Sequence, residues 1–145
     1  MLTGMIGFLS FALAFSAGAQ GKSTKKEVKI TRKKEANDKG DSVVVYYGVA
    51  SYYADKFSGR KTANGALYGH TLMTAACNVL PLGTWIRVTN LKNKKTIVVQ
   101  VNDRLHYKNN RLVDVSKMGA EKLNFIKDGL ARVMVEVLGK KKPKL

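Results

Sequence analysis

The sequence predicts a mainly β fold, a six-stranded barrel with one short helix, in residues 43–138. Several short segments rich in β-branched and aromatic residues alternate between apolar and polar positions, as in strands with one buried face. Only one segment has a helical pattern, and Gly, Pro and Asn separate the others. Six or seven short strands would leave exposed edges in an open sheet, and closure into a barrel removes those edges.

The first half of the domain provides three strands. Val and Tyr dominate residues 43–53, which predict the first strand, with a bulge or kink at Gly48. Residues 54–69 form a long polar loop, which in a compact domain is usually functional or disordered. A short apolar segment at residues 72–77 and an alternating segment at residues 84–90 predict two further strands.

The second half centres on the alternating strand at residues 96–101, which a hairpin joins to the strand before it. A short return strand is predicted at residues 111–115. Ser116 is a suitable N-cap for the one helix, at residues 117–125. Valines at every second position predict a last strand at residues 130–138.

The N-terminal segment predicts export. Residues 1–19 contain no charged side chain and end in Ala17-Gly18-Ala19, the small-x-small pattern of a signal peptidase site. The apolar run is short for a membrane span, so no stable membrane insertion is expected after cleavage, although an N-terminal anchor helix stays an alternative. We expect the mature protein in the periplasm or cell envelope, with no nearby cysteine to carry a lipid.

Two charged segments flank the domain: a flexible linker is predicted at residues 20–42 and a basic tail at residues 139–145. The whole chain has a net charge of +16, with a positive surplus in the linker, the domain and the tail. This surplus favours a polyanionic partner such as a wall polymer, although a basic surface that only aids solubility fits as well. Export and the lack of a nucleic-acid-binding signature exclude nucleic acid as the expected partner.

Asp103 is the first candidate for catalysis, because a strand delivers it to the mouth of a loop. The alternative is that Asp103 caps a turn or pairs with Arg104. Asp114 lies between valines and is expected to be a structural acceptor, paired with Arg104 or Arg111. Cys77 is the only cysteine, so no internal disulfide can form. We expect it to be a small buried apolar residue rather than a nucleophile.

His70 and His106 lie in predicted loops. Each is either an exposed residue without a role or a proton-transfer group near Asp103. Two histidines, one cysteine and no acidic cluster predict no metal site, and no cofactor is expected. Aromatic side chains, among them Tyr53 and Tyr107, provide ring faces against which a ligand can stack, unless they belong to the core.

Seven collinear motifs resemble the rare lipoprotein A (RlpA) family, and they cover the whole predicted domain. They lie at residues 48–53, 57–65, 72–76, 80–84, 88–91, 101–104 and 111–116. The resemblance implies a double-psi β-barrel, shared with barwin and expansin domains. It also implies a lytic transglycosylase that cleaves peptidoglycan glycan strands, preferably strands without stem peptides, and that works beside other cell-wall or division proteins.

This chain departs from the family pattern at positions that matter for catalysis. Ala66 stands where the family usually has Glu, and Cys77 where it usually has His; Leu105 and His106 replace a Gly-Pro pair. The resemblance therefore carries over a single catalytic residue, Asp103. Substrate contacts are expected from Arg104, Asn64, Tyr53 and Tyr107. The alternative function is a barrel that binds glycan strands without cleaving them.

Overall fold

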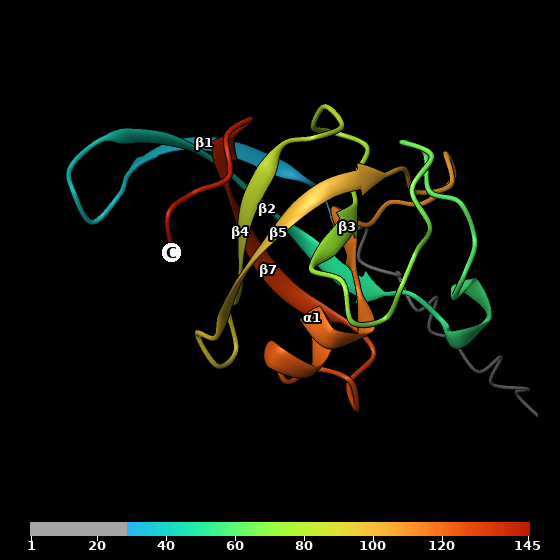
Figure 1. The fold of residues 1–145 in the computed structure, drawn as a ribbon. Helices are drawn as coiled ribbons and strands as arrows, with labels where there is room; N and C mark the ends of the chain where they lie inside the picture. The colour runs from blue at the N-terminus through green and yellow to red at the C-terminus, as the bar shows by residue number, and fades with distance from the viewer. Residues whose placement is uncertain (1–28) are drawn as a thin grey trace, which may run out of the picture.

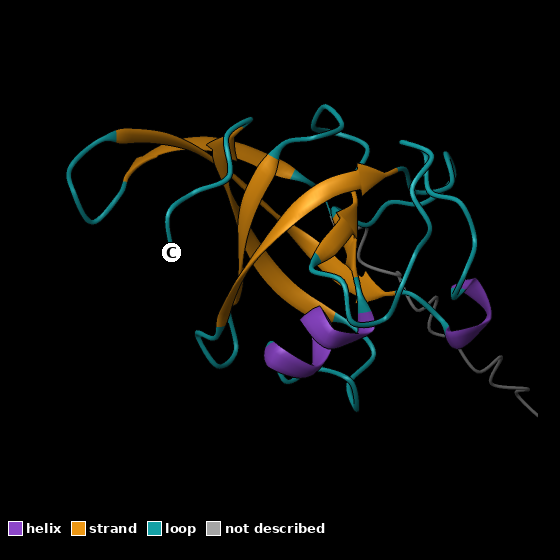
Figure 2. Ribbon diagram, viewed as in Figure 1, coloured by secondary structure: helices purple, strands orange, loops and turns teal. Residues whose placement is uncertain are grey.

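A computed structural model describes residues 29–145. The strands are β1 (Thr31–Ala36), β2 (Ser42–Tyr52), β3 (Thr74–Ala76), β4 (Trp85–Asn90), β5 (Thr96–Asp103), β6 (Val113–Val115) and β7 (Ala131–Gly139). One α-helix, α1 (Lys117–Lys122), and one 3-10 turn, η1 (Asp55–Phe57), complete the elements (Figures 1 and 2). The predicted signal peptide lies outside the described residues, and within them no helix is long and apolar enough to cross a membrane.

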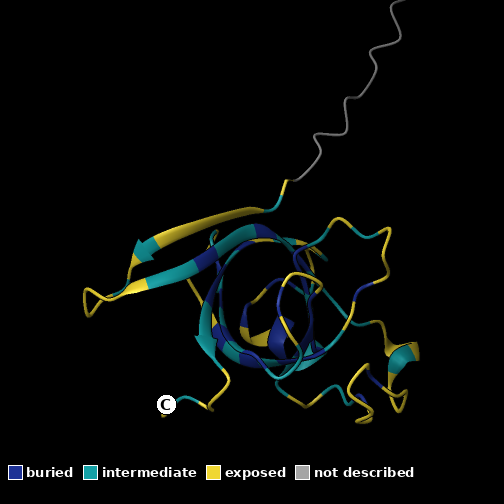
Figure 3. Ribbon diagram, turned by 90° about the horizontal axis from the view of Figure 1, so that it is seen from above, coloured by how far each residue is buried: buried dark blue, intermediate teal, exposed yellow. Residues whose placement is uncertain are grey.

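Six of the strands close into a barrel, which confirms the predicted fold class. Their order around the barrel is β2-β6-β3-β5-β4-β7, and β7 pairs with β2 again to close the ring. Seen end-on, the closed ring surrounds a buried interior (Figure 3). Strand β1 is a seventh strand outside the ring, and among the described strands it pairs with β2 alone.

Two parallel pairings distinguish this barrel from a simple meander. β2 pairs with β6, and β3 pairs with β5, in parallel; the other pairs are antiparallel. β2 runs opposite to β3 and β5, but the short strands β3 and β6 bring the ends of β2 and β5 into one region of the barrel. There Ser51 pairs with Asp114, Asp114 with Ala76, and Ala76 with Asp103.

The interior is filled by the apolar positions that alternate along the strands. In β5, Val99 and Val101 are fully buried while Val98 and Gln100 are not, as the alternating pattern predicts. Phe125 and Leu123 lie beyond α1 and are also fully buried in the core. Burial of such side chains stabilises each by roughly 1.5–3 kcal/mol relative to exposure.

Strand β2 runs without the bulge predicted at Gly48. Its pairing with β7 keeps one register from Val45 to Ala50. Glycine is needed there for a different reason, because a Cβ at position 48 would lie 2.7 Å from the Cβ of Leu112. The glycine therefore lets the chain before β6 pack directly on β2.

The prediction of a flexible linker is wrong for residues 31–36, which form β1. The turn after β1 is held by Asn37, whose Oδ1 accepts the N–H groups of Lys39 (3.0 Å) and Asp41 (2.8 Å). β1 is almost entirely exposed, so backbone pairing with β2 rather than apolar burial holds it. A prediction based on burial of apolar residues had no means of finding this strand.

The helix begins as predicted and ends earlier. The N–H of Gly119 donates to Oγ of Ser116 at 3.2 Å, which confirms the N-cap. α1 ends at Lys122 rather than Phe125, because Asn124 takes a left-handed conformation with φ of 56°.

Candidate active site

A groove of about 670 Å³ lies on the side of the barrel where β2, β3 and β5 end. One wall is the loop 54–69, and the other contains the end of β5 and the loop that follows it. Its lining combines aromatic rings with the carboxylates of Asp103 and Asp114. The structure therefore agrees with the predicted position of Asp103, which lies where β5 ends and a loop begins.

The carboxylate of Asp103 is held by three donors from three parts of the chain. Oδ2 accepts the hydroxyl of Tyr53 at 2.6 Å. Oδ1 accepts the N–H groups of Ala63 at 2.9 Å and Arg104 at 2.8 Å. These bonds fix the orientation of the carboxylate in the groove, as a group that transfers protons requires.

Tyr53 directly follows β2, and its N–H bonds to the carbonyl of Val115. Its ring stacks on Tyr68 at 4.2 Å between centroids and meets Phe57 edge-on at 5.9 Å. Burial, and then the hydrogen bond to Asp103, raise the pKa of Tyr53 well above its ordinary value of 10.0. Tyr53 therefore stays protonated and donates to Asp103 throughout the neutral range.

The guanidinium of Arg104 points away from Asp103. It donates to the backbone carbonyl of Cys77 and, at 2.5 Å, to that of Leu80. Among the described residues it forms no ion pair with Asp103, so the alternative of an Asp103–Arg104 salt bridge is wrong. Arg104 steadies Asp103 through its backbone N–H, while its side chain holds the loop after β3 in place and lines the groove.

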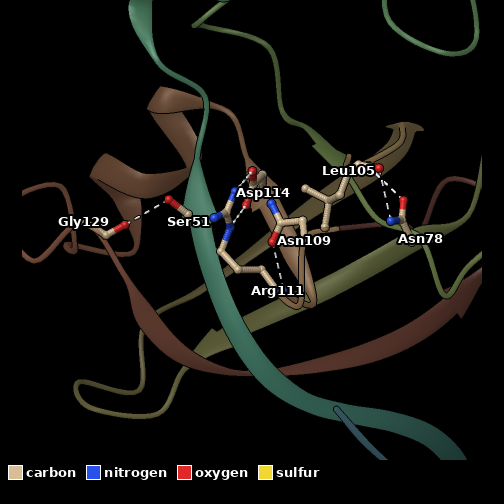
Figure 4. A network of polar contacts seen from close by, with 7 residues as sticks. All are labelled: Ser51, Asn78, Leu105, Asn109, Arg111, Asp114 and Gly129. Carbon is tan, nitrogen blue, oxygen red and sulfur yellow. Dashed lines mark hydrogen bonds and ion pairs between the residues drawn. The ribbon is translucent and has the colours of Figure 1, made fainter. Parts of the chain in front are cut away.

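Arg111, rather than Arg104, is the partner of Asp114. Nε and Nη2 of Arg111 donate to the two carboxylate oxygens at 2.7 Å each (Figure 4). The Asp114 side chain is 15% exposed and that of Arg111 35%. A bidentate pair of this kind is among the stronger hydrogen-bonded contacts, which supports a structural role for Asp114. Asn109 adds to the same loop by accepting the N–H of Arg111 at 2.9 Å.

The four predicted substrate contacts divide into two groups. Tyr53 and Arg104 line the groove. Asn64 lies outside the lining, and its Oδ1 accepts the hydroxyl of Thr62 at 2.6 Å. Tyr107 is 79% exposed and also lies outside the lining.

Of the four positions that depart from the family pattern, Leu105 and His106 line the groove, whereas Ala66 and Cys77 lie outside its lining. Cys77 is fully buried, and burial raises the pKa of its thiol, so it is an unreactive core residue, as its sequence context predicts. Ala66 is exposed, and its carbonyl accepts the N–H of Thr62 at 2.8 Å.

The two histidines are placed differently. His106 is exposed and lines the groove. His70 lies outside it, with Nδ1 2.9 Å from the hydroxyl of Tyr68 and Nε2 3.6 Å from Asp55. In residues 29–145 there is no group of three or more His, Cys, Asp and Glu side chains that would hold a metal ion.

Sequence reasoning missed the contact between Tyr53 and Asp103. The two residues are fifty positions apart in the chain. Their placement at the ends of two predicted strands was the only available signal, and it required the order of strands around the barrel.

Comparisons with known proteins agree with this architecture. A family model described as "Lytic transglycolase" matches residues 45–135. The "Endolytic peptidoglycan transglycosylase RlpA" of Neisseria meningitidis serogroup B is 47% identical over 89 residues, which are 61% of this chain and 37% of that protein. The protein of the same name from Rickettsia bellii is 49% identical over 94 residues, 63% of this chain and 41% of the relative.

Among solved structures, the "Streptomyces papain inhibitor (SPI)" matches with a TM-score of 0.52 and 20% identity. The match covers 64% of this chain and 93% of the inhibitor, and it is a likeness of fold alone. Together with the family match it confirms the expected double-psi β-barrel. The chain spans less than half the length of the curated relatives described above.

Proposed function

This chain belongs to the lytic transglycolase family, and from that membership we propose that it is an endolytic peptidoglycan transglycosylase of the RlpA type. Its substrate would be glycan strands, preferably those without stem peptides, and its products would end in 1,6-anhydro sugars. The observation that supports the proposal best is Asp103, oriented by three donors within the groove.

The proposed reaction needs one carboxyl group in two successive roles. Asp103 in its acid form protonates the oxygen of the glycosidic bond, and the bond to C1 of the muramic acid residue breaks. The resulting carboxylate then accepts the proton of that sugar's C6 hydroxyl, whose oxygen bonds to C1 and closes the 1,6-anhydro ring. Since the nucleophile comes from the sugar, the second carboxylate of an ordinary glycosidase is not required.

The surroundings of Asp103 fit this double role. Oδ1 already accepts two N–H groups, whereas Oδ2 accepts only the hydroxyl of Tyr53, so Oδ2 is the oxygen with capacity left for the substrate. The rings of Tyr53 and Phe57 give the groove an aromatic wall against which a sugar ring can pack, and the buried ring of Tyr68 supports Tyr53 from behind.

A second candidate function is glycan binding without turnover. The observation that favours it is the placement of Ala66 and Cys77, neither of which supplies a proton-transfer group to the groove. Loss of an assisting acid or base typically lowers a rate by roughly 10²–10⁴-fold. We further propose that the protein acts in the periplasm or cell envelope, where peptidoglycan is its partner and other cell-wall or division proteins work beside it.

Digestion of amidase-stripped glycan strands, followed by mass spectrometry of the products, distinguishes the two functions. A transglycosylase gives fragments with 1,6-anhydro ends, which are lighter by one water than the reducing ends that hydrolysis gives. Uncut strands that nevertheless sediment with the protein would establish the binding function instead.

A further inference from the structure

The lining of the groove contains more cationic than anionic side chains. Its lining contains five cationic side chains, those of Lys56, Arg60, Lys61, Arg104 and Arg111, against two carboxylates. Within residues 29–145, Arg111 is paired with its carboxylate, and Arg104 donates to backbone carbonyls. The remaining three cations have no carboxylate partner in that range.

These three residues, Lys56, Arg60 and Lys61, form what we call the cationic rim. All three lie on the loop 54–69 and are exposed at the groove. Nζ of Lys56 and Cζ of Arg60 each lie 5.4 Å from the ring centroid of Phe57. The aromatic ring thus holds two of the cations at one wall.

The same wall leads to the catalytic carboxylate. Phe57 meets Tyr53 edge-on at 5.9 Å, and the hydroxyl of Tyr53 is 2.6 Å from Asp103. A sugar positioned for proton transfer at Asp103 therefore has the cationic rim beside it. The place of these three cations beside Asp103, rather than their lack of a carboxylate partner, sets them apart from the other basic side chains.

We propose that the cationic rim binds the free lactyl carboxylates of N-acetylmuramic acid, an inference that rests on the proposed function. The lactyl ether of this sugar ends in a carboxylate when no stem peptide is attached and in a neutral amide when one is. The bond that a lytic transglycosylase breaks is at C1 of the muramic acid residue, so the lactyl group belongs to the sugar that reacts. The rim thereby distinguishes peptide-free strands by charge.

The experiment measures strand binding separately from cleavage. Asp103→Asn is introduced in every protein so that strands stay intact, and Kd is measured at low salt. The strands are amidase-stripped, and a second batch has its lactyl carboxylates converted to methylamides with carbodiimide and methylamine. The two batches share the same sugars and differ only at the lactyl group, where a charged carboxylate becomes a neutral methylamide.

Arg60→Gln/Lys61→Gln is expected to weaken binding to the charged strands by roughly 3- to 30-fold, the effect of losing two partly exposed charge pairs. Binding of the charged strands is also expected to weaken with salt, since exposed charges are screened. The methylamide strands should bind both proteins equally. The matched control is Lys95→Gln/Arg132→Gln, which removes two exposed cations near the opposite end of β5 and should leave Kd unchanged.

Equal binding of the charged and methylamide strands by the protein with its rim intact would overturn the inference and leave the proposed function in place. So would an equal loss of affinity in the rim variant and the control variant. Charge-dependent binding through the rim, without 1,6-anhydro products from the protein that retains Asp103, would support the inference while contradicting the enzymatic function.

Discussion

At the scale of single residues, three hydrogen-bond donors orient the carboxylate of Asp103. Tyr53 is the most specific of these, because it donates to Oδ2, the oxygen with capacity left for substrate. Its raised pKa keeps it a donor rather than an anion beside the carboxylate. We therefore propose that Tyr53 positions Asp103 and that its ring forms part of the wall that binds a sugar.

Tyr53→Phe should lower kcat roughly 10-fold, or about 1.4 kcal/mol in activation free energy, with KM nearly unchanged. The ring and its stacking stay, so substrate binding is preserved, but Oδ2 of Asp103 loses its fixed partner. Steady-state kinetics on stripped strands measure both constants.

Tyr68→Phe provides the matched control, because it removes a hydroxyl from the other stacked ring, one that contacts His70 and Lys117 instead of Asp103. Equal losses of kcat in the two variants would contradict a specific role of the Tyr53 hydroxyl in positioning Asp103.

The sequence predicted correctly that Asp103 lies at a loop mouth, but the alternative of a salt bridge with Arg104 is wrong, since Arg104 contacts Asp103 only through its backbone N–H. Arg104 is adjacent in sequence, and its guanidinium nevertheless turns toward Cys77 and Leu80. Tyr53 is distant in sequence and makes the contact. The direction of a side chain at the end of a strand depends on tertiary packing, and the local sequence pattern does not predict it.

At the scale of elements, the groove lies where the short strands β3 and β6 bring the ends of β2 and β5 into one region. β6 is short, with three residues, and lies between β2 and β3. The bidentate pair of Asp114 and Arg111 links this strand to the chain that enters it. That pair should therefore stabilise the groove wall as well as the barrel.

Asp114→Asn is expected to lower the free energy of unfolding by about 1–2 kcal/mol, because Arg111 loses a charge-assisted bidentate partner. Asp128→Asn is the comparison, since Asp128 is 49% exposed and pairs with Lys92, which is 79% exposed. A change below about 0.5 kcal/mol is expected there. Urea unfolding measures both, and equal effects would contradict a special role for the Asp114 pair.

Hydrophobic periodicity along the sequence predicted some of the strands correctly and missed others. The alternation of β5 predicted its buried face correctly, because its apolar positions fill the barrel. β1 escaped prediction because it buries almost nothing, and its pairing depends on the edge that β2 presents. Gly48 was misread because the side chain that approaches it, Leu112, lies far along the chain.

At the scale of the whole molecule, barrel closure was predictable and the function of the groove was only partly so. Short alternating strands predicted the closed fold without any tertiary information. The high positive charge of the chain, +16, did not by itself indicate a site. The structure shows that part of this charge, from Lys56, Arg60 and Lys61, lies at the wall of the groove.

The most direct test of the central claim is product analysis of stripped glycan strands with the unaltered chain, Asp103→Asn and Asp128→Asn side by side. If Asp103 performs both proton transfers, 1,6-anhydro fragments form with the unaltered chain and Asp128→Asn and are lost with Asp103→Asn. The Asn keeps the shape of the side chain but cannot protonate the glycosidic oxygen. Undiminished 1,6-anhydro products from a folded Asp103→Asn protein would contradict the role of Asp103 and place the chemistry elsewhere.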